Sequence, residues 1–388
     1  MVLPADFDEE RIEIDVQESG GHSGAYTRRM AVALRAMITL SRRVAAVAVK
    51  TVSAIDEAGQ YYTRPTDVHA QSSRSPDSLS RAARAISRRL ICRMRVTFVG
   101  LGAIGWPMAT HLAERHELTV YNRTTARATD FARRYPARVT ETPGQAADGA
   151  DVVVTCLPTS REVEAMLDGA NGLLAGLRRG AMLLDCTSGD PASSRRIAGR
   201  LAEKGIAFAD APVSGGTNGA EAGTLTVMVG ADESTYQRAV PVLRAFGQRI
   251  QHMGPVGTGH AMKAVNNALL AANILAVGEG LAALVKAGVP ARTAVEVLNA
   301  SSGRSFVSES LVPERVLTGA WPRTFRLALL DKDVAIACDL LEDTGVPGKI
   351  IATSGKLLAE VRAALGEEAD YLEAIRWIEQ RAAVAIRG

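Results

Sequence analysis

The sequence has few cysteines and no histidine pattern that would hold a metal. Its four cysteines, Cys92, Cys156, Cys186 and Cys338, are scattered and include no CxxC pair. This spacing argues against a disulfide framework and against a zinc site, and it favours reduced thiols. The six histidines show no HxxxH-type spacing either, so we expect no metal site.

The chain also lacks an excess of one charge and a long uncharged apolar run. Its 45 basic and 42 acidic residues leave a net charge of +3, which gives no reason to expect nucleic acid or a membrane as a partner. The apolar stretch 30–52 contains three arginines and a lysine, whereas a membrane span needs about 20 apolar residues. Acidic residues near the start do not fit a secretory or mitochondrial leader. We therefore expect a cytoplasmic protein.

The 388 residues are enough for two domains and additional material. Residues 1–93 differ from the rest: an acidic start precedes a Gly/Ser cluster, and residues 63–80 are rich in Ser, Arg and Pro. Such a polar segment buries too little apolar area to offset the entropy of ordering it. We expect residues 1–93 to be either a poorly ordered extension or a misassigned start that precedes a natural Met94.

Residues 94–258 alternate between short apolar runs and segments of helical length, such as the expected helix Ile104–Arg115. This alternation predicts an α/β domain with a Rossmann-type, doubly wound parallel sheet. The expected strands are Arg95–Val99, Leu118–Tyr121, Asp151–Leu157, Met182–Cys186, Ala207–Ala209 and Leu225–Val229.

Residues 259–388 are expected to form an all-α C-terminal domain. The stretch Ala261–Val289 has no proline and few charges, so it predicts a long interdomain helix of roughly 43 Å. A helix that is apolar on most sides must be buried between domains or between subunits, which indicates a homodimer or a homotetramer. Further helices are expected at Thr293–Asn299, Asp331–Asp343, Ile350–Leu365 and Tyr371–Ala383.

A glycine-rich loop follows the first expected strand and opens a helix. Gly100-Leu101-Gly102-Ala103-Ile104-Gly105 matches the GxGxxG pattern in the context that supports dinucleotide binding. The first glycine allows a tight turn, the second lets the backbone approach the pyrophosphate, and the third lets helix and strand pack closely. We expect all six residues to contact the cofactor.

The second expected strand ends at Asn122-Arg123-Thr124, without the acidic residue that usually binds the ribose of NAD. The guanidinium of Arg123 suits a 2′-phosphate, and Asn122 and Thr124 can add hydrogen bonds. These residues predict that NADP is preferred over NAD. In the alternative interpretation, Arg123 stacks on the adenine and discriminates little.

Four spaced motifs together resemble the β-hydroxyacid dehydrogenase family, from Met94 to near the C-terminus. Ile104 and His111 depart mildly from the family pattern, which usually has Met and Asn there. The motifs are residues 99–109 (VGLGAIGWPMA), residues 210–216 (DAPVSGG) with 223–230 (GTLTVMVG), residues 259–267 (GHAMKAVNN), and Phe325 with Lys332-Asp333.

Two of these motifs predict where the substrate binds. Ser214-Gly215-Gly216 is a small polar turn whose backbone N–H groups can form an anion-binding nest, and the resemblance implies that it holds a substrate carboxylate. Lys263 and Asn267 lie four residues apart, on one face of the long helix. Burial would lower the pKa of Lys263 and make proton exchange feasible near neutral pH. The resemblance implies that Lys263 is the catalytic acid/base and that Asn267 orients the substrate.

The resemblance also implies that Leu157, Pro158 and Ser188, which follow the ends of expected strands, contact the ribose and nicotinamide side of the cofactor. This is the edge of a doubly wound sheet at which ligands bind. It further implies that Lys332 lies near the cofactor and the substrate. The alternative for Lys332 is a lysine on a helix surface that pairs with Asp333 or Asp331.

These residues together predict an oxidoreductase that transfers hydride between NADP(H) and a short β-hydroxy acid or semialdehyde carboxylate. The partner is then a small carboxylate. An imine reductase of the same fold is one alternative, although such proteins typically lack the lysine. A non-catalytic dinucleotide-binding module is another, and its known examples have lost the lysine. Phosphogluconate-type decarboxylation would need a longer helical domain.

Overall fold

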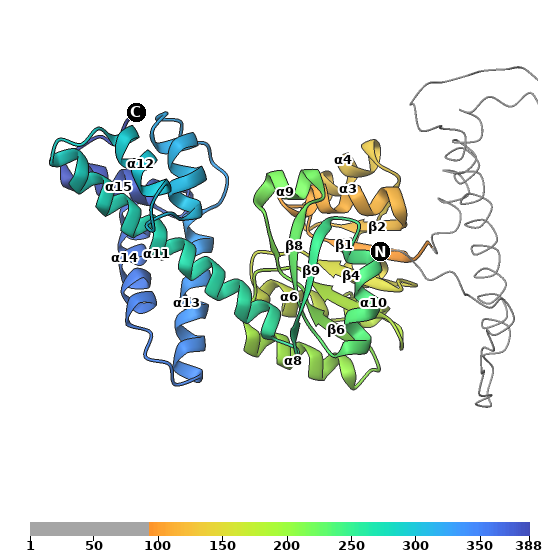
Figure 1. Cartoon of the computed structure of the whole chain (residues 1–388). Helices are drawn as coiled ribbons and strands as arrows, with labels where there is room; N and C mark the ends of the chain where they lie inside the picture. The colour runs from red at the N-terminus through yellow and green to blue at the C-terminus, as the bar shows by residue number, and fades with distance from the viewer. Residues whose placement is uncertain (1–92) are drawn as a thin grey trace, which may run out of the picture. The chain divides into compact units, whose positions relative to one another are not determined.

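The structure of the chain, a computed structural model, describes residues 93–388 (Figure 1). Within this range a sheet-containing region extends from Arg95 to Gly254, and helices follow from Thr258 onward. The expectation for residues 1–93 falls on residues that lie, except for Arg93, outside the described ones.

Within residues 93–388, nine strands form one sheet in the order β3-β2-β1-β4-β5-β6-β8-β7, with β9 paired to β8. The strands β1 to β6 are all parallel, and their order is that of a dinucleotide-binding sheet, with its reversal point between β1 and β4. The strands are β1 Arg95–Val99, β2 Glu117–Tyr121, β3 Ala137–Val139, β4 Val152–Thr155, β5 Met182–Asp185, β6 Ala207–Asp210, β7 Val213–Ser214, β8 Leu225–Gly230 and β9 Gly247–Gly254.

The predicted doubly wound parallel sheet is confirmed for β1 to β6, and the departure from it is β8, which runs antiparallel to both β6 and β7. In a parallel crossover the connection must carry the chain back to the amino end of the sheet before the next strand begins. Residues 211–224 instead continue β6 as β7, turn through the helix α9 (Gly216–Ala222) and return as β8. The turn Ser214–Gly216 therefore lies beyond the carboxyl end of β6.

Helices cover both faces of the sheet, and the central strands β1, β4, β5 and β6 are buried on both sides. Phe98 packs in the cluster on one face and Val99 in the cluster on the other, as the alternation of side chains along a strand requires. On the Phe98 face lie α3 (Gly105–Arg115), α4 (Thr125–Arg134) and α10 (Glu233–Leu243), and on the Val99 face lie α5 (Pro143–Ala147), α6 (Ser160–Leu167), α7 (Leu173–Gly176) and α8 (Pro191–Ala202).

The long helix α11 (Thr258–Lys286) joins the sheet to the helical domain (Figure 1). It contacts β6, β8, β9 and α8, and farther along it packs against the helices that follow. By length and apolar composition alone α11 could cross a membrane. However, Ala268, Ala271 and Ile274 are fully buried in the core of the helical domain, so α11 is the central helix of that domain.

The helical domain contains one element that the sequence did not indicate, the π-helix η1 (Val307–Val316). Pro313 lies inside η1 and cannot donate a backbone hydrogen bond, and a proline argues against a helix in sequence reasoning. The remaining helices agree with expectation to within four residues. They are α12 (Ala291–Asn299), α13 (Leu327–Asp343), α14 (Lys349–Leu365) and α15 (Glu373–Ala382).

A buried ion pair holds the start of α13 in place. The carboxylate of Asp370 lies 3.4 Å from Arg315 and accepts the backbone N–H groups of Thr324 at 2.7 Å, Phe325 at 3.0 Å and Leu372 at 3.1 Å. Both charged side chains are buried. These bonds fix the segment that leads into α13, the helix that carries Lys332.

We expect Asp370→Ala to lower the free energy of unfolding by about 3–5 kcal/mol, because it leaves the Arg315 guanidinium buried without its counter-ion. Urea unfolding followed by circular dichroism measures this change. Asp339→Ala, at an exposed position of α13, is the control and should change stability by less than about 0.5 kcal/mol. Equal effects of the two substitutions would contradict the structural role of the buried pair.

Candidate active site

The glycine-rich loop has the geometry that a dinucleotide needs. A Cβ atom on Gly105 would collide with the Gly100 carbonyl oxygen, so α3 can begin this close to β1 only with glycine there. Nothing lies within 4 Å of a Cβ built on Gly102, which leaves its backbone open to a ligand. The N-cap residue Ile104 offers no side-chain hydrogen bond to the first turn of α3. That positive helix end can therefore receive a pyrophosphate.

Asn122 ties the two cofactor loops together. Its side-chain oxygen accepts the N–H of Leu101 at 3.0 Å, and its amide nitrogen donates to the carbonyl of Thr124 at 3.0 Å. The amide is thus engaged within the protein, which sequence reasoning did not foresee. Arg123 and Thr124 are exposed beside it, and within residues 93–388 no acidic side chain forms an ion pair with Arg123.

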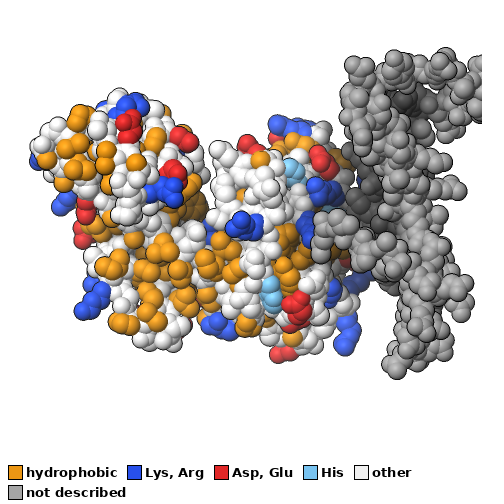
Figure 2. All heavy atoms as spheres, viewed as in Figure 1, with side chains coloured by type: hydrophobic (Ala, Val, Ile, Leu, Met, Phe, Trp, Pro, Cys, Tyr) orange, Lys and Arg blue, Asp and Glu red, His pale blue; other side chains and the backbone are white. Residues whose placement is uncertain are grey.

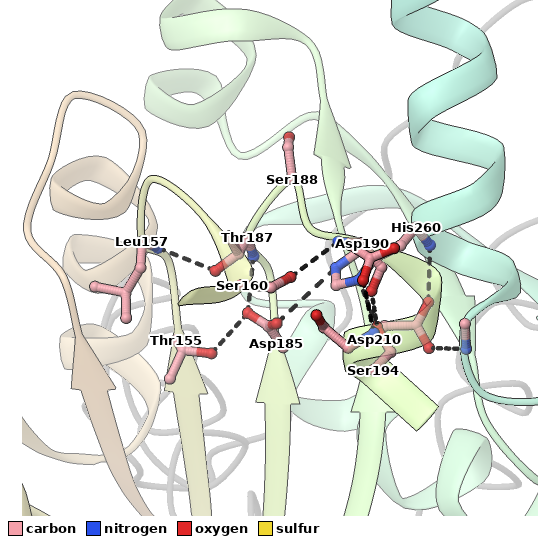
Figure 3. A network of polar contacts seen from close by, with 12 residues as sticks. Thr155, Leu157, Ser160, Asp185, Thr187, Ser188, Asp190, Ser194, Asp210 and His260 are labelled. Atoms are coloured by element: carbon pink, nitrogen blue, oxygen red, sulfur yellow. Dashed lines mark hydrogen bonds and ion pairs between the residues drawn. The ribbon is translucent and has the colours of Figure 1, made fainter. Parts of the chain in front are cut away.

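Polar contacts link the loops that follow β4 and β5 (Figure 3). The N–H of Leu157 donates to the hydroxyl of Thr187 at 3.1 Å. The buried carboxylate of Asp185 accepts the hydroxyl of Thr155 at 2.8 Å and the N–H of Thr187 at 3.1 Å. Pro158 and Ser188 lie in the same two loops. The expected cofactor residues therefore lie together at the carboxyl ends of neighbouring strands.

Lys332 of α13 reaches the β5 loop and donates a hydrogen bond to the carbonyl oxygen of Ser188. Its ammonium also lies 2.7 Å from Asp333. Asp333 is 2% exposed and accepts the amide of Asn267 at 2.5 Å. The alternative pairing of Lys332 with Asp333 thus forms, but the lysine extends toward the sheet rather than lying on an outer helix surface.

Asn267 is buried, and its side chain faces Asp333. Its oxygen accepts the amide of Asn266 at 3.0 Å. In this arrangement Asn267 fixes the orientation of Asp333, and through it that of Lys332. The i, i+4 spacing from Lys263 did place both side chains on one helix face, but it could not identify this partner on another helix.

Lys263 is half-buried on α11. Burial lowers the pKa of its ammonium below the ordinary value, while the Asp333 carboxylate opposes the shift and Lys332 adds to it. The charge of Lys263 on α11 therefore interacts with the charges of Asp333 and Lys332 on α13. A lysine in this setting releases its proton more readily than a solvated one, as an acid/base group requires.

The turn Ser214–Gly216 begins α9 without a side-chain cap. Gly215 and Gly216 have φ angles of 134° and 64°, a left-handed backbone that turns successive N–H groups outward. Both glycines are exposed. Among the described residues, no hydrogen bond joins this turn to Lys263 or Lys332.

Two buried carboxylates at the carboxyl ends of β5 and β6 were not identified from the sequence. Asp185 supports the β5 loop, and Asp210 accepts the N–H groups of Gly257 at 2.6 Å and His260 at 2.8 Å. Burial raises the pKa of Asp210, whereas His260 and these N–H groups oppose the shift. The sequence shows each as an acidic residue at the end of an apolar run, and Asp210 also opens the motif of residues 210–216.

Comparison with known proteins gives two family matches that together cover most of the described residues. Residues 95–254 match the NAD-binding domain of 6-phosphogluconate dehydrogenase. Residues 257–378 match the NAD-binding domain of NADP-dependent 3-hydroxyisobutyrate dehydrogenase.

Several curated relatives align over most of their length. The 2-(hydroxymethyl)glutarate dehydrogenase of Eubacterium barkeri is 37% identical over 303 residues, which is 76% of this chain and 98% of that protein. The human mitochondrial 3-hydroxyisobutyrate dehydrogenase is 33% identical over 68% of this chain and 81% of its own length. An NAD-dependent L-serine dehydrogenase of Pseudomonas aeruginosa is 37% identical over 62% of this chain and 78% of its own length.

A solved structure supports the same assignment. The 3-hydroxyisobutyrate dehydrogenase of Mycobacterium tuberculosis with L-serine is 29% identical, has a TM-score of 0.67, and is matched over 74% of this chain and 99% of its own. The fold, the dinucleotide loop and the family matches agree. The chain belongs to the β-hydroxyacid dehydrogenase family, whose members are NAD(P)-dependent oxidoreductases that act on CH–OH groups.

Proposed function

We propose that this protein transfers hydride between NADP(H) and a short β-hydroxy acid or the matching semialdehyde, with Lys263 as general acid/base. The observation that carries the proposal is the position of Lys263. It is half-buried beside Asp333 and Lys332, and Lys332 touches the loop after β5. Lys263, whose ammonium has a lowered pKa, thus lies near the edge of the sheet at which nicotinamide cofactors bind.

The residues present fit a dinucleotide. The open backbone at Gly102 and the uncapped start of α3 would receive the pyrophosphate. Arg123 would pair with a 2′-phosphate, and the loops at Leu157 and Ser188 would face the ribose and nicotinamide. When bound, the cofactor supplies the acceptor or donor of hydride.

In the oxidative direction the neutral amine of Lys263 accepts the hydroxyl proton as the C–H bond gives up its hydride and the C=O bond forms. In reduction the ammonium of Lys263 returns that proton to the carbonyl oxygen as hydride adds to carbon. The nest at Ser214–Gly216 would hold the substrate carboxylate. NADP preference favours the reductive direction.

The relatives support a particular substrate shape. Their names specify 2-(hydroxymethyl)glutarate, 3-hydroxyisobutyrate and L-serine, and each of these compounds carries a primary alcohol on the carbon next to the one that bears a carboxylate. We therefore place the substrate among acids of this form. The carboxylate nest and the acid/base lysine are the two parts of the site that such a molecule needs.

A substrate panel tests the proposal. NADP and NAD are supplied with 3-hydroxyisobutyrate, L-serine and 2-(hydroxymethyl)glutarate, and NADPH with the corresponding aldehydes and a cyclic imine. Turnover of one of the hydroxy acids supports the proposal. Reduction of the imine alone would replace the proposed function with imine reduction, and cofactor binding without any turnover would indicate a non-catalytic module.

Lys263→Met should lower kcat by roughly 10²–10⁴-fold, the range of general acid–base catalysis, with little change in cofactor affinity. The pH dependence of the rate tests the same residue. Because burial lowers the pKa of Lys263, the rate of oxidation should rise with pH through that pKa, where the amine becomes neutral. The rate of reduction should fall over the same pH interval, because reduction needs the ammonium. Both changes in rate should occur below the ordinary lysine pKa of 10.5 and should be absent in Lys263→Met. A pH dependence that persists in Lys263→Met would assign the proton transfer to another group.

Arg123→Ala should raise the Kd of NADPH by roughly 10- to 100-fold, because it removes a charge-assisted bond worth about 1.5–3 kcal/mol. The Kd of NADH, which lacks the 2′-phosphate, should hardly change. Fluorescence titration of the reduced cofactors measures both constants. Arg133→Ala, at an exposed position of the same region, serves as the control. A similar rise for both cofactors would favour stacking of Arg123 on the adenine.

We also propose that α11 contributes to a homodimer or homotetramer. Large apolar side chains of α11 are not covered within the chain, since Met262 and Leu269 are 44% and 53% exposed. Figure 2 shows hydrophobic side chains gathered along the region that α11 crosses in Figure 1. A second copy would cover such a face.

Sedimentation should give a multiple of the 41.0 kDa chain mass, and Leu269→Glu should shift it toward the monomer. The physical reason is the cost of burying an unpaired carboxylate at an apolar contact. Ala363→Glu, at an exposed position of α14, should leave the mass unchanged. A monomeric wild-type protein would rule the assembly out.

A further inference from the structure

His260 is a fully buried histidine (0% exposed) in the first turn of α11, and its ring lies against the loop after β5 and against Ser194 of α8. Figure 3 shows it between the strand ends that carry Asp185 and Asp210. Its backbone N–H donates to Asp210 at 2.8 Å, and its Nδ1 lies 2.7 Å from the hydroxyl of Ser194. The acid/base scheme described above does not use this side chain.

The hydrogen bonds around Ser194 indicate which ring nitrogen carries a proton. The Ser194 hydroxyl has only one proton to give, and it lies nearer to Nδ1 of His260, at 2.7 Å, than to the carbonyl of Asp190, at 3.1 Å. That carbonyl also accepts the backbone N–H of Ser194 at 3.0 Å. Donation from Ser194 to Nδ1 leaves the proton of a neutral imidazole on Nε2, which points toward Asp185.

Nε2 of His260 and Oδ2 of Asp185 lie 4.0 Å apart. Both atoms are buried, and neither makes a hydrogen bond to a residue of the described range. The other carboxylate oxygen of Asp185 accepts the N–H of Thr187, and Thr187 in turn holds Leu157. The imidazole thus brings α11 against the carboxylate that supports the two cofactor loops.

The packing around the ring leaves little freedom. A Cβ atom on Gly189 would lie 2.6 Å from Cε1 of His260 and 2.5 Å from the Ser160 hydroxyl, so the loop after β5 rests directly on the imidazole. Lys263 follows His260 by three residues, which places it on the same side of the helix about one turn farther. A change at His260 would thus alter the position of Lys263 relative to that loop.

We propose that His260 is a positioning residue for hydride transfer: together with Asp185 and Ser194, it sets the position of Lys263 relative to the Thr187–Ser188 loop. The interaction is electrostatic attraction between a buried carboxylate and a polarised imidazole, reinforced by contact with Gly189. This inference rests on the proposed function, because it assumes that Lys263 exchanges the proton and that the loop faces the nicotinamide.

The test compares three replacements of His260. His260→Ala should lower kcat by at least roughly tenfold, since a misplacement of about 1 Å can cost 100-fold, while the Kd of NADPH stays unchanged. Glutamine reaches as far as Nε2, whereas asparagine reaches only as far as Nδ1. His260→Gln should therefore recover more of kcat than His260→Asn, and the deuterium isotope effect on kcat should rise in the order wild type, Gln, Ala.

His116→Ala is the matched control. His116 is another buried histidine, at the end of α3, and its ring nitrogens have no hydrogen-bond partner among the described residues. It should lose stability without a selective loss of kcat. The positioning role is wrong if His260→Ala loses activity only in proportion to the fraction of unfolded protein, as the control does. It is also wrong if His260→Gln recovers no more of kcat than His260→Asn. Ser194→Ala, which removes only the partner of Nδ1, supplies a milder variant should His260→Ala fail to fold.

Hydrogen exchange separates this inference from the proposed function. In His260→Gln and Ser194→Ala, peptides covering residues 185–190 and 258–264 should lose protection together relative to wild type, whatever the substrate. A wild-type protein that turns over no hydroxy acid would refute the proposed substrate class, but this exchange result would still show the coupling. Exchange that changes in only one of the two segments would overturn the inference.

Discussion

The carboxylate of Asp210 accepts backbone N–H groups from Gly257 and His260 at the start of α11. An acidic group at a helix N-terminus offsets the unpaired N–H groups and the helix dipole. Here that group comes from the end of β6, so the bond joins the sheet to the helix that enters the helical domain. The position of every functional group on α11 relative to the sheet follows from this attachment, and Gly259 is required because a Cβ there would lie 2.8 Å from the same carboxylate.

A second attachment is made from the opposite direction. Asp370 and Arg315 fix the entry to α13, and from α13 Lys332 reaches the carbonyl of Ser188. The buried Asp333 then couples the ammonium groups of Lys332 and Lys263 electrostatically. Charges that would be costly to bury singly are thus paired, and burial still lowers the pKa of Lys263 against the opposing effect of Asp333. Stability and proposed chemistry depend on the same few buried groups.

Much of the fold could be predicted from local patterns, and the failures have physical causes. Apolar runs bounded by helical segments identified β1, β2, β4, β5, β6 and β8. The strands β1, β4, β5 and β6 bury side chains on both faces, and β2 and β8 bury alternate residues in the core on one face. The two-residue β7, the polar β9 and the π-helix around Pro313 carry no such pattern. The direction of β8 was also missed, because strand direction depends on where a connection returns and not on the residues within the strand.

The sequence by itself determined the dinucleotide loop at Gly100–Gly105, the family and the candidate lysine, because each depends on residue types at fixed spacing along one segment. Only the tertiary structure decided that Asn122 links two loops, that Asn267 donates a hydrogen bond to Asp333, and that Asp185 and His260 face each other. These contacts join residues from 21 to 75 positions apart, and spacing along the chain carries no information about them. Side-chain partners across a fold are selected by packing, which exists only once the sheet and helices have assembled.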